Sequence, residues 1–245
     1  MTFKTAAEKY QYVNQMFARI AHRYDTMNRI MTLGQDKSWR CRLVEQAELP
    51  PGGLLLDLAT GTGDIAFEAL RQQPQLGYVV GADYTLPMMH VGQQRWAKMP
   101  GHNGQGPNQR LSWSGADALR LPFSDNSFDA VASGFLMRNV VSVSAALAEQ
   151  VRVCKAGGRV LILEIPRPPA NLFGQLFRLY FHNVVPVLGG FISGQREAYS
   201  YLPASADAFL RPDELTSAMR SAGLNPVNYE MLMVNTVALH VGVKS

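Results

Sequence analysis

A glycine-containing turn follows a hydrophobic stretch in LLLDLATGTGD, residues 54–64. Gly61 and Gly63 permit a tight strand-to-helix turn and a close approach of the backbone to a ligand, and Ala66 completes a G-x-G-x-x-A pattern. Asp83 lies about 20 residues further on, where an acid can accept hydrogen bonds from ribose hydroxyls. Together these residues predict a site for a ligand that contains a nucleoside.

Charge distinguishes two ligands of this kind. Asp57 precedes the turn and Asp64 follows it. These carboxylates would repel the pyrophosphate of a nicotinamide dinucleotide and attract the ammonium and sulfonium groups of S-adenosylmethionine, which disfavours a dehydrogenase. We interpret Asp64 as the N-cap of the next helix. We expect S-adenosylmethionine to be bound at the mouth of the turn by Asp57, Ala59, Thr60, Gly61, Thr62 and Gly63.

Two further segments supply candidate cofactor residues. GADALRLPF places Asp117 and Ala118 after a strand, where a carboxylate can accept a hydrogen bond from the adenine amine and an amide can meet a ring nitrogen. The alternative for Asp117 is that it only caps a turn. FDAVASGFLMRNV ends another strand at Gly134, so that residues 135–139 face the methyl group to be transferred. Tyr84, which follows Asp83, belongs to the same predicted site.

Short apolar runs alternate with helical patterns through the first two-thirds of the chain, which is typical of βαβ units and a parallel sheet. A helix from near Pro212 to Gly223 and a hairpin turning at Asn235-Thr236 follow. The strands expected before them are 54–58, 78–83, 111–114, 130–133 and 159–164. Ligands bind beyond the carboxyl ends of such strands, so we expect convergence on one rim of residues 57–63, 83, 117 and 134–139.

Two apolar segments can cover that rim. The N-terminal arm, residues 1–45, is predicted to be helical, and we interpret its apolar stripe as packing on the sheet, with a ligand-covering role as the alternative. The stripe consists of Val13, Met16, Phe17, Ile20, Tyr24, Met27 and Met31. Residues 170–205 are predicted to form a lid. Arg178 and His182 interrupt its apolar part, residues 171–192, which disfavours a membrane span and leaves open a substrate lid, an interfacial helix or a buried helix pair.

Composition favours one α/β domain over residues 1–245, because 47% of the residues are hydrophobic and 17% are charged. The net charge is +4 with scattered Lys and Arg, which gives nucleic-acid binding little support and leaves an anionic membrane surface open. Cys41 and Cys154 lack metal-ligand spacing, so no metal site and a reducing cytoplasm are expected. We read no secretory signal at the N-terminus and a Gly/Asn loop at residues 101–110.

Longer motifs carry a family resemblance. YDTMNRIMTLGQDKSW, residues 24–39, and RVCKAGGRVLILEIPRP, residues 152–168, resemble two signatures of the ubiquinone/menaquinone biosynthesis C-methyltransferases, and DLATGTGD, LPFSDNSFD, RNV and VALHVG match in order. The resemblance implies a class I, Rossmann-like methyltransferase: a doubly wound, mostly parallel seven-stranded sheet with an antiparallel last strand. It also implies C-methylation of a polyprenylated quinol. Demethylmenaquinol is preferred, and the alternatives are a benzoquinol of ubiquinone biosynthesis, another lipid phenol, or a non-catalytic S-adenosylmethionine-binding subunit.

The resemblance also suggests roles for residues. It places Arg138 and Asn139 beside the quinol ring, where we expect Asn139 to orient a water and Arg138 to stabilise the developing phenolate. Tyr24 is expected to fold over the cofactor, and Asp25 and His182 are weaker candidates for the proton acceptor. The family usually has a histidine where this chain has Asp36, so we assign Asp36 no catalytic role. We expect a cytoplasmic protein with peripheral contact at the inner face of the membrane, and a homodimer remains open.

Overall fold

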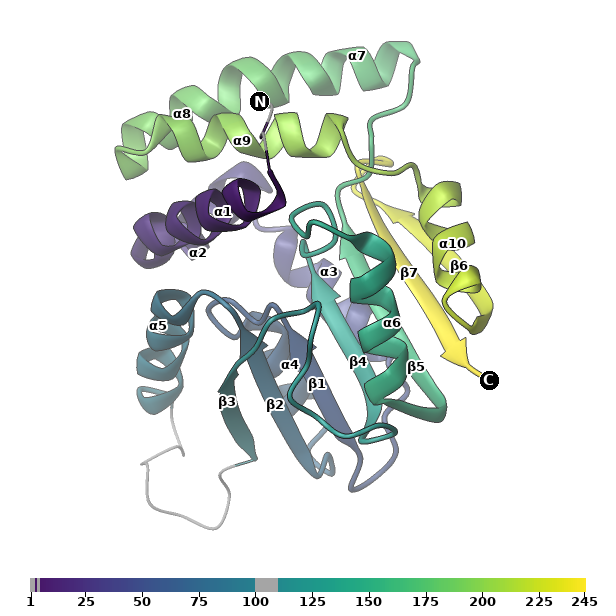
Figure 1. The fold of residues 1–245 in the computed structure, drawn as a ribbon. Coiled ribbons are helices and arrows are strands. Elements are labelled where there is room, and N and C mark those ends of the chain that lie inside the picture. Colours follow the sequence, from purple (N-terminus) through teal and green to yellow (C-terminus); the bar gives the residue numbers. More distant parts are fainter. Residues whose placement is uncertain (1–2, 4, 100–109) are drawn as a thin grey trace.

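The computed structural model describes residues 3, 5–99 and 110–245. Its strands form a seven-stranded sheet in the order β3-β2-β1-β4-β5-β7-β6 (Figure 1). Strands β1 to β5 pair in parallel, whereas β7 runs antiparallel to both β5 and β6. The predicted doubly wound sheet with an antiparallel last strand is therefore confirmed. The strands are β1 Leu54–Leu58, β2 Tyr78–Asp83, β3 Leu111–Gly115, β4 Phe128–Gly134, β5 Cys154–Glu164, β6 Leu224–Leu232 and β7 Val237–Lys244.

Helices cover both faces of the sheet, because its central strands are apolar on both sides. Leu55 and Leu56 are neighbours in β1 and point to opposite faces, yet both are fully buried. Helices α3 (Asp36–Gln46) and α4 (Asp64–Gln72) pack on the face of Leu55, and α6 (Val143–Val153) and α10 (Pro212–Ser221) pack on the face of Leu56. Burial on both faces is the usual environment of parallel strands.

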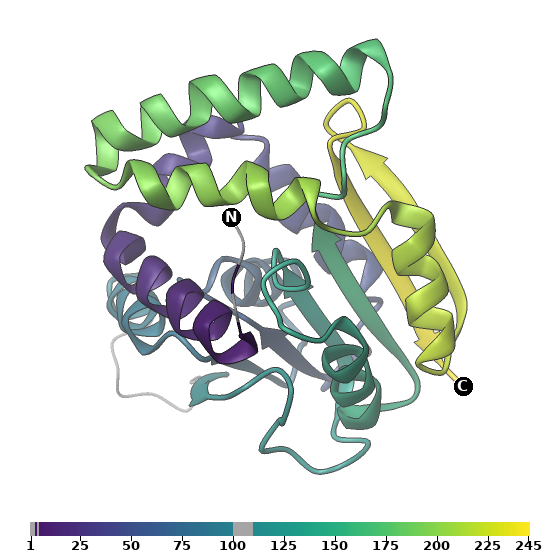
Figure 2. The same ribbon diagram turned by 45° about the horizontal axis from the view of Figure 1, so that its top comes forward.

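The arm and the lid lie together over the carboxyl edge of the sheet, as Figures 1 and 2 show. The arm continues through α1 Ala6–Ile20, a 3₁₀ turn Ala21–Arg23, α2 Tyr24–Met31 and α3. The lid contains α7 Leu172–Leu179, a π-helical turn Tyr180–Val184, α8 Val185–Ser193 and α9 Arg196–Asp207. Helix α5, Leu86–Ala97, follows β2.

The apolar stripe of the arm packs against the lid. Met16 and Met27 are fully buried in one cluster with Phe181, Val185 and Tyr199 of the lid helices. The interpretation that this stripe packs on the sheet is therefore wrong. The lid offers a second apolar surface, and burying the two against each other removes both from water.

Two strands begin earlier than the sequence pattern indicated. β4 starts at Phe128 and β5 at Cys154, and their register shifts between Phe128 and Ala130. Of the loop expected at residues 101–110, all but Arg110 lies outside the described residues.

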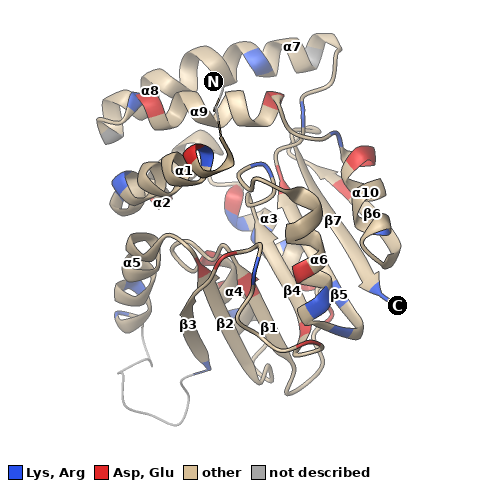
Figure 3. Cartoon of the chain, in the orientation of Figure 1, with Lys and Arg blue, Asp and Glu red and all other residues tan. Residues whose placement is uncertain are grey.

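Charge and hydropathy of the described residues agree with the sequence. Figure 3 shows Lys and Arg distributed over many elements instead of being gathered on one. Within the described ranges, no helix combines the length and the apolar character needed to cross a bilayer.

Candidate active site

A cavity lies at the carboxyl ends of β1, β2 and β4 and encloses about 830 Å³, its open mouth included. The predicted convergence of these strand ends on one rim is therefore confirmed. The arm covers the cavity from above with residues such as Tyr10, Val13 and Phe17, so the stripe also has the ligand-covering position. The sequence-predicted residues that line it are Tyr24, Ala59, Gly61, Asp83, Tyr84, Asp117, Ala118, Gly134 and Asn139.

The turn between β1 and α4 contains two glycines with a left-handed backbone. Gly61 and Gly63 have φ angles of +56° and +90°, in the left-handed region that favours glycine. A Cβ atom at Gly63 would lie 2.7 Å from the ring of Phe67. The Asp83 carboxylate holds the turn, because Oδ2 accepts a hydrogen bond from Gly61 N at 2.8 Å and Oδ1 accepts one from Thr85 N at 2.7 Å. Asp83 thus both supports the turn and faces the cavity.

Asp57 lies beneath this turn and not at its mouth. It is fully buried, and its Oδ2 accepts hydrogen bonds from Thr60 Oγ1 at 2.6 Å and from Ala66 N at 3.0 Å. Burial raises the pKa of Asp57 to about 7. Asp57, Thr60, Thr62 and Gly63 are absent from the described lining of the cavity. Their contact with a cofactor stays a prediction, and what the structure shows is that Asp57 supports the turn.

The charges that face the cavity are acidic. Among the described residues that line it are Asp83 and Asp117 and no Lys or Arg. Asp117 also accepts a hydrogen bond from Leu119 N at 2.9 Å, so it caps its turn as well as facing the cavity. A cavity of this charge fits the cationic S-adenosylmethionine and disfavours a pyrophosphate. The cavity is therefore lined by carboxylates, as predicted, but these are Asp83 and Asp117 in place of Asp57 and Asp64.

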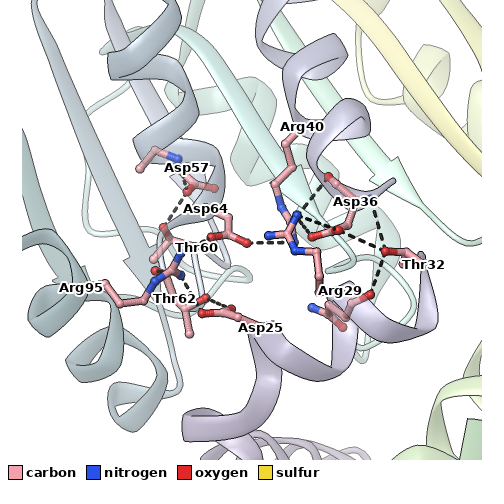
Figure 4. Close-up of polar contacts among 12 residues, drawn as sticks. Asp25, Arg29, Thr32, Asp36, Arg40, Asp57, Thr60, Thr62, Asp64 and Arg95 are labelled. Atoms are coloured by element: carbon pink, nitrogen blue, oxygen red, sulfur yellow. Dashed lines mark hydrogen bonds and ion pairs between the residues drawn. The ribbon is translucent and has the colours of Figure 1, made fainter. Parts of the chain in front are cut away.

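Asp64 has a different role from the one predicted. Gly63 occupies the N-cap of α4, and Asp64 is the first helical residue. The Asp64 carboxylate lies 2.7 Å from Arg95 and 3.2 Å from Arg40 (Figure 4). Burial opposes its ionisation, but the two guanidinium groups outweigh this and hold the pKa of Asp64 below its usual range. The N-cap interpretation is therefore wrong, because the left-handed glycine begins the helix and the carboxylate binds arginines.

The same charges continue into the arm. Asp36 is 2% exposed and pairs with Arg40 at 2.5 Å and Arg29 at 3.2 Å. On the other side, Asp25 pairs with Arg95 at 2.8 Å and accepts a hydrogen bond from Thr62 Oγ1 at 2.6 Å. Figure 4 shows the resulting row of alternating charges. The row connects α2 and α3 of the arm to the turn between β1 and α4, the cofactor turn.

A second cavity of about 710 Å³, its open mouth again included, adjoins the first. Its walls come from α2 and α3 of the arm, the lid helices and the strand ends, and they are mainly apolar and aromatic. Tyr24 and Phe135 line both cavities and form a shared wall. Phe135 has a φ angle of +59°, a left-handed conformation that costs a residue with a side chain about 1–2 kcal/mol. Strain of this kind often occurs at functional sites.

The predicted catalytic pair lies at this wall. Arg138 lines the second cavity and Asn139 the first. Arg138 Nη1 pairs with Glu164 Oε2 at 2.5 Å, and its buried Nε has no hydrogen-bond partner among the described residues. Asn139 Oδ1 accepts a hydrogen bond from Tyr201 OH at 3.0 Å. Sequence reasoning missed Glu164 and Tyr201, although Glu164 ends an expected strand.

The two weaker candidates for the proton acceptor lie elsewhere. His182 Nε2 is 2.8 Å from Asp207 Oδ2, and its side chain is 41% exposed on the lid. Neither His182 nor Asp25 belongs to the described lining of either cavity. The role of either residue as proton acceptor stays a prediction.

Comparisons with known proteins agree with this geometry. A model of the ubiE/COQ5 methyltransferase family matches residues 4–244. A demethylmenaquinone methyltransferase of Roseiflexus castenholzii is 44% identical over 97% of this chain and 95% of its own length. A ubiquinone/menaquinone biosynthesis C-methyltransferase of Desulfotalea psychrophila is 41% identical over 95% of this chain and 90% of its own length. A solved S-adenosylmethionine-dependent methyltransferase of Thermotoga maritima has a similar fold, with a TM-score of 0.63 at 16% identity over 94% of this chain and 99% of that one.

The raised pKa of Asp57 predicts a loss of stability as the pH rises. Below about pH 4 Asp57 is neutral in both the folded and the unfolded chain. Between about pH 4 and 7 it ionises in the unfolded chain and stays neutral in the folded one, so rising pH stabilises the unfolded chain; near pH 7 the folded chain ionises too. Between pH 5 and 7.5 the free energy of unfolding of the wild type should fall by roughly 2 kcal/mol more than that of Asp57→Asn. Urea unfolding at both pH values measures this. Equal losses in the two proteins would contradict the buried environment of Asp57.

The position of Asp83 predicts a loss of cofactor affinity. Asp83→Asn removes a charged acceptor at the cavity, so the Kd for S-adenosylmethionine should rise roughly 10- to 100-fold in calorimetry. Asp129→Asn is the matched control, because this carboxylate binds Lys155 and Leu54 N outside both cavities. An unchanged Kd for Asp83→Asn, or an equal rise in the control, would rule out a direct role of Asp83.

Proposed function

The chain belongs to the ubiE/COQ5 methyltransferase family, and on that premise we propose that it transfers the methyl group of S-adenosylmethionine to a ring carbon of demethylmenaquinol. The name of the Roseiflexus relative, a demethylmenaquinone methyltransferase, supports demethylmenaquinol as the substrate, whereas the name of the Desulfotalea relative includes both ubiquinone and menaquinone. The observation that carries the proposal is the pair of adjoining cavities of different character. One is rimmed by Asp83 and Asp117, and the other is apolar around Arg138.

The cofactor is S-adenosylmethionine, and the first cavity fits it. We propose that Asp83 accepts hydrogen bonds from the ribose hydroxyls and Asp117 one from the adenine amine. Both carboxylates line the cavity together with apolar residues such as Met88 and Leu119. When bound, the cofactor supplies the electrophilic methyl group. Tyr24 and Phe135 line both this cavity and the next, so a bound methyl donor and a ring carbon would meet beside these two side chains. Orientation of two reactants in this way contributes about 7–11 kcal/mol.

The second cavity suits the quinol ring. A ring carbon becomes nucleophilic once a neighbouring hydroxyl loses its proton, so the oxygen left behind needs a donor. Arg138 lines this cavity, and its Nε has no hydrogen-bond partner among the described residues, so the guanidinium keeps a donor that is not used within the protein. Asn139, on the cofactor side of the same turn, orients a water that takes this hydroxyl proton. After the carbon–carbon bond has formed, the hydrogen of the methylated ring carbon leaves as a proton and the ring oxygen is reprotonated, so one proton is released for each methyl group transferred. Asp36 also lines this cavity, but Arg29 and Arg40 occupy its carboxylate, which supports a positioning role for it.

Alternative functions receive less support. A benzoquinol or another lipid phenol could enter the second cavity by the same chemistry. A non-catalytic cofactor-binding subunit is disfavoured, because such a subunit has no need of a buried guanidinium in a second cavity beside the cofactor. A dehydrogenase is disfavoured by the acidic rim of the first cavity.

The lid also supports peripheral contact with a membrane. Phe177, Phe181 and Val185 on its inner side line the second cavity, and the outer side is exposed and apolar. The lid, residues 170–205, contains two arginines and one acid, a glutamate, and this small positive excess favours an anionic lipid surface at the inner face of the membrane. Docking on this face would bring the cavity to the prenyl tail. The exposed apolar residues are Leu172, Leu176, Leu179, Val184, Val187 and Phe191.

Removal of the Arg138 charge tests the proposed chemistry. Arg138→Gln combined with Glu164→Gln avoids leaving one buried charge unpaired, and it should lower kcat for demethylmenaquinol methylation by roughly 10²- to 10³-fold without changing the Kd for S-adenosylmethionine. The matched control is Lys155→Gln with Asp129→Asn, an ion pair that joins β5 and β4 at their opposite ends. Full activity of the first double variant would refute the role of Arg138.

The outer face of the lid predicts vesicle binding. Leu176→Ser, Leu179→Ser and Phe191→Ser together should weaken binding to anionic phospholipid vesicles by about 100-fold or more, because each removes exposed apolar surface. Sedimentation with anionic and with zwitterionic vesicles measures the binding. Methylation of a short-tailed, water-soluble quinol should be unaffected. Equal vesicle binding by the wild type and the triple variant would show that this face does not meet the membrane.

A further inference from the structure

A hydrogen bond connects the lid to the Arg138–Asn139 turn. Tyr201 in α9 is 4% exposed, and its hydroxyl donates to Asn139 Oδ1 at 3.0 Å. At the other end of the same amide, Asn139 Nδ2 donates to the carbonyl oxygen of Phe135 at 2.8 Å. Both ends of the amide are therefore held. A flipped amide would place its oxygen against the Phe135 carbonyl, which is unfavourable.

The surroundings of Tyr201 make it a permanent donor. Its ring packs against that of Tyr12 in the arm, with centroids 5.6 Å apart. Burial raises the pKa of Tyr201 to about 12, and the nearby Arg138 guanidinium only partly opposes this. The hydroxyl thus keeps its proton at neutral pH, so it can orient Asn139 but cannot accept a proton from a substrate.

The arm holds the same turn through its backbone. Lys9 Nζ in α1 donates to the carbonyl oxygens of Arg138 at 3.2 Å and Val140 at 2.7 Å. The turn is therefore contacted by the arm at its main chain and by the lid at its side chain. Of these two contacts, the one from the lid reaches the amide oxygen of Asn139.

We propose that Tyr201 is a positioning residue, supplied by the lid, which fixes the side-chain amide of Asn139 in the orientation needed for methyl transfer. The proposal rests on the role given to Asn139 in the proposed function. The lid then has two functions: it covers the apolar cavity, and it completes the orientation of a polar group on the cofactor side of the wall.

Tyr201→Phe removes the hydroxyl and keeps the ring. Loss of one hydrogen bond should lower kcat roughly three- to tenfold, with the KM for S-adenosylmethionine unchanged. In an Asn139→Ala background the same substitution should have no further effect, because the partner is already absent. Tyr229→Phe is the matched control: it removes an equal 3.0 Å hydrogen bond, to Asp213 Oδ1, from a tyrosine on β6 outside both cavities. The control should leave kcat unchanged.

A second measurement needs no substrate. The side-chain amide resonances of Asn139 should shift and broaden in Tyr201→Phe and stay unchanged in Tyr229→Phe. Undisturbed resonances together with unchanged kcat would overturn the proposal, as would an equal drop in kcat with and without Asn139. Wild-type protein that methylates no quinol while the resonances shift as expected would instead contradict the proposed function and leave the hydrogen bond in place.

Discussion

A buried ion pair between Arg138 and Glu164 holds together the strand ends beside which the two cavities meet. The two side chains are 4% and 1% exposed, so both charges have left water, which costs several kcal/mol per ion unless other polar groups compensate. The compensation is visible: Glu164 Oε1 accepts from Arg138 N and Oε2 accepts from Ile165 N, each at 3.2 Å. The pair thus joins the ends of β4 and β5. A guanidinium held there in low dielectric acts more strongly on a nearby oxygen than one in water.

The remaining charges of the site give the two cavities different ligand preferences. Arg40 and Arg95 lie close to the cofactor turn, but the carboxylates of Asp36, Asp64 and Asp25 occupy them. The cofactor cavity therefore keeps an acidic rim, and the arm is attached to the turn by the same contacts. In this chain Asp36 holds the row together at its outer end. A histidine there could not offer two anionic oxygens to two arginines.

Local rules predicted the sheet well and the side-chain partners poorly. β1 and β2 have the expected bounds, because each is a short apolar run that ends at polar residues, and the rim follows from the geometry of parallel strands. The prediction that Asp64 is an N-cap is wrong because it used only neighbouring residues, whereas the carboxylate binds Arg95, which lies 31 residues away. Tyr201 is 62 residues from Asn139, and no spacing in the sequence indicates that contact. Likewise, an amphipathic arm does not reveal whether it meets the sheet or a lid.

The most direct test of the two-cavity arrangement is a crystal structure with S-adenosylhomocysteine and an unreactive demethylmenaquinol analogue bound together. We expect the adenosine beside Asp83 and Asp117, the quinol ring beside Arg138, and the sulfur and the ring carbon facing each other beside Tyr24 and Phe135 with no side chain between them. A ring bound outside the lid, or an adenosine in the apolar cavity, would contradict it.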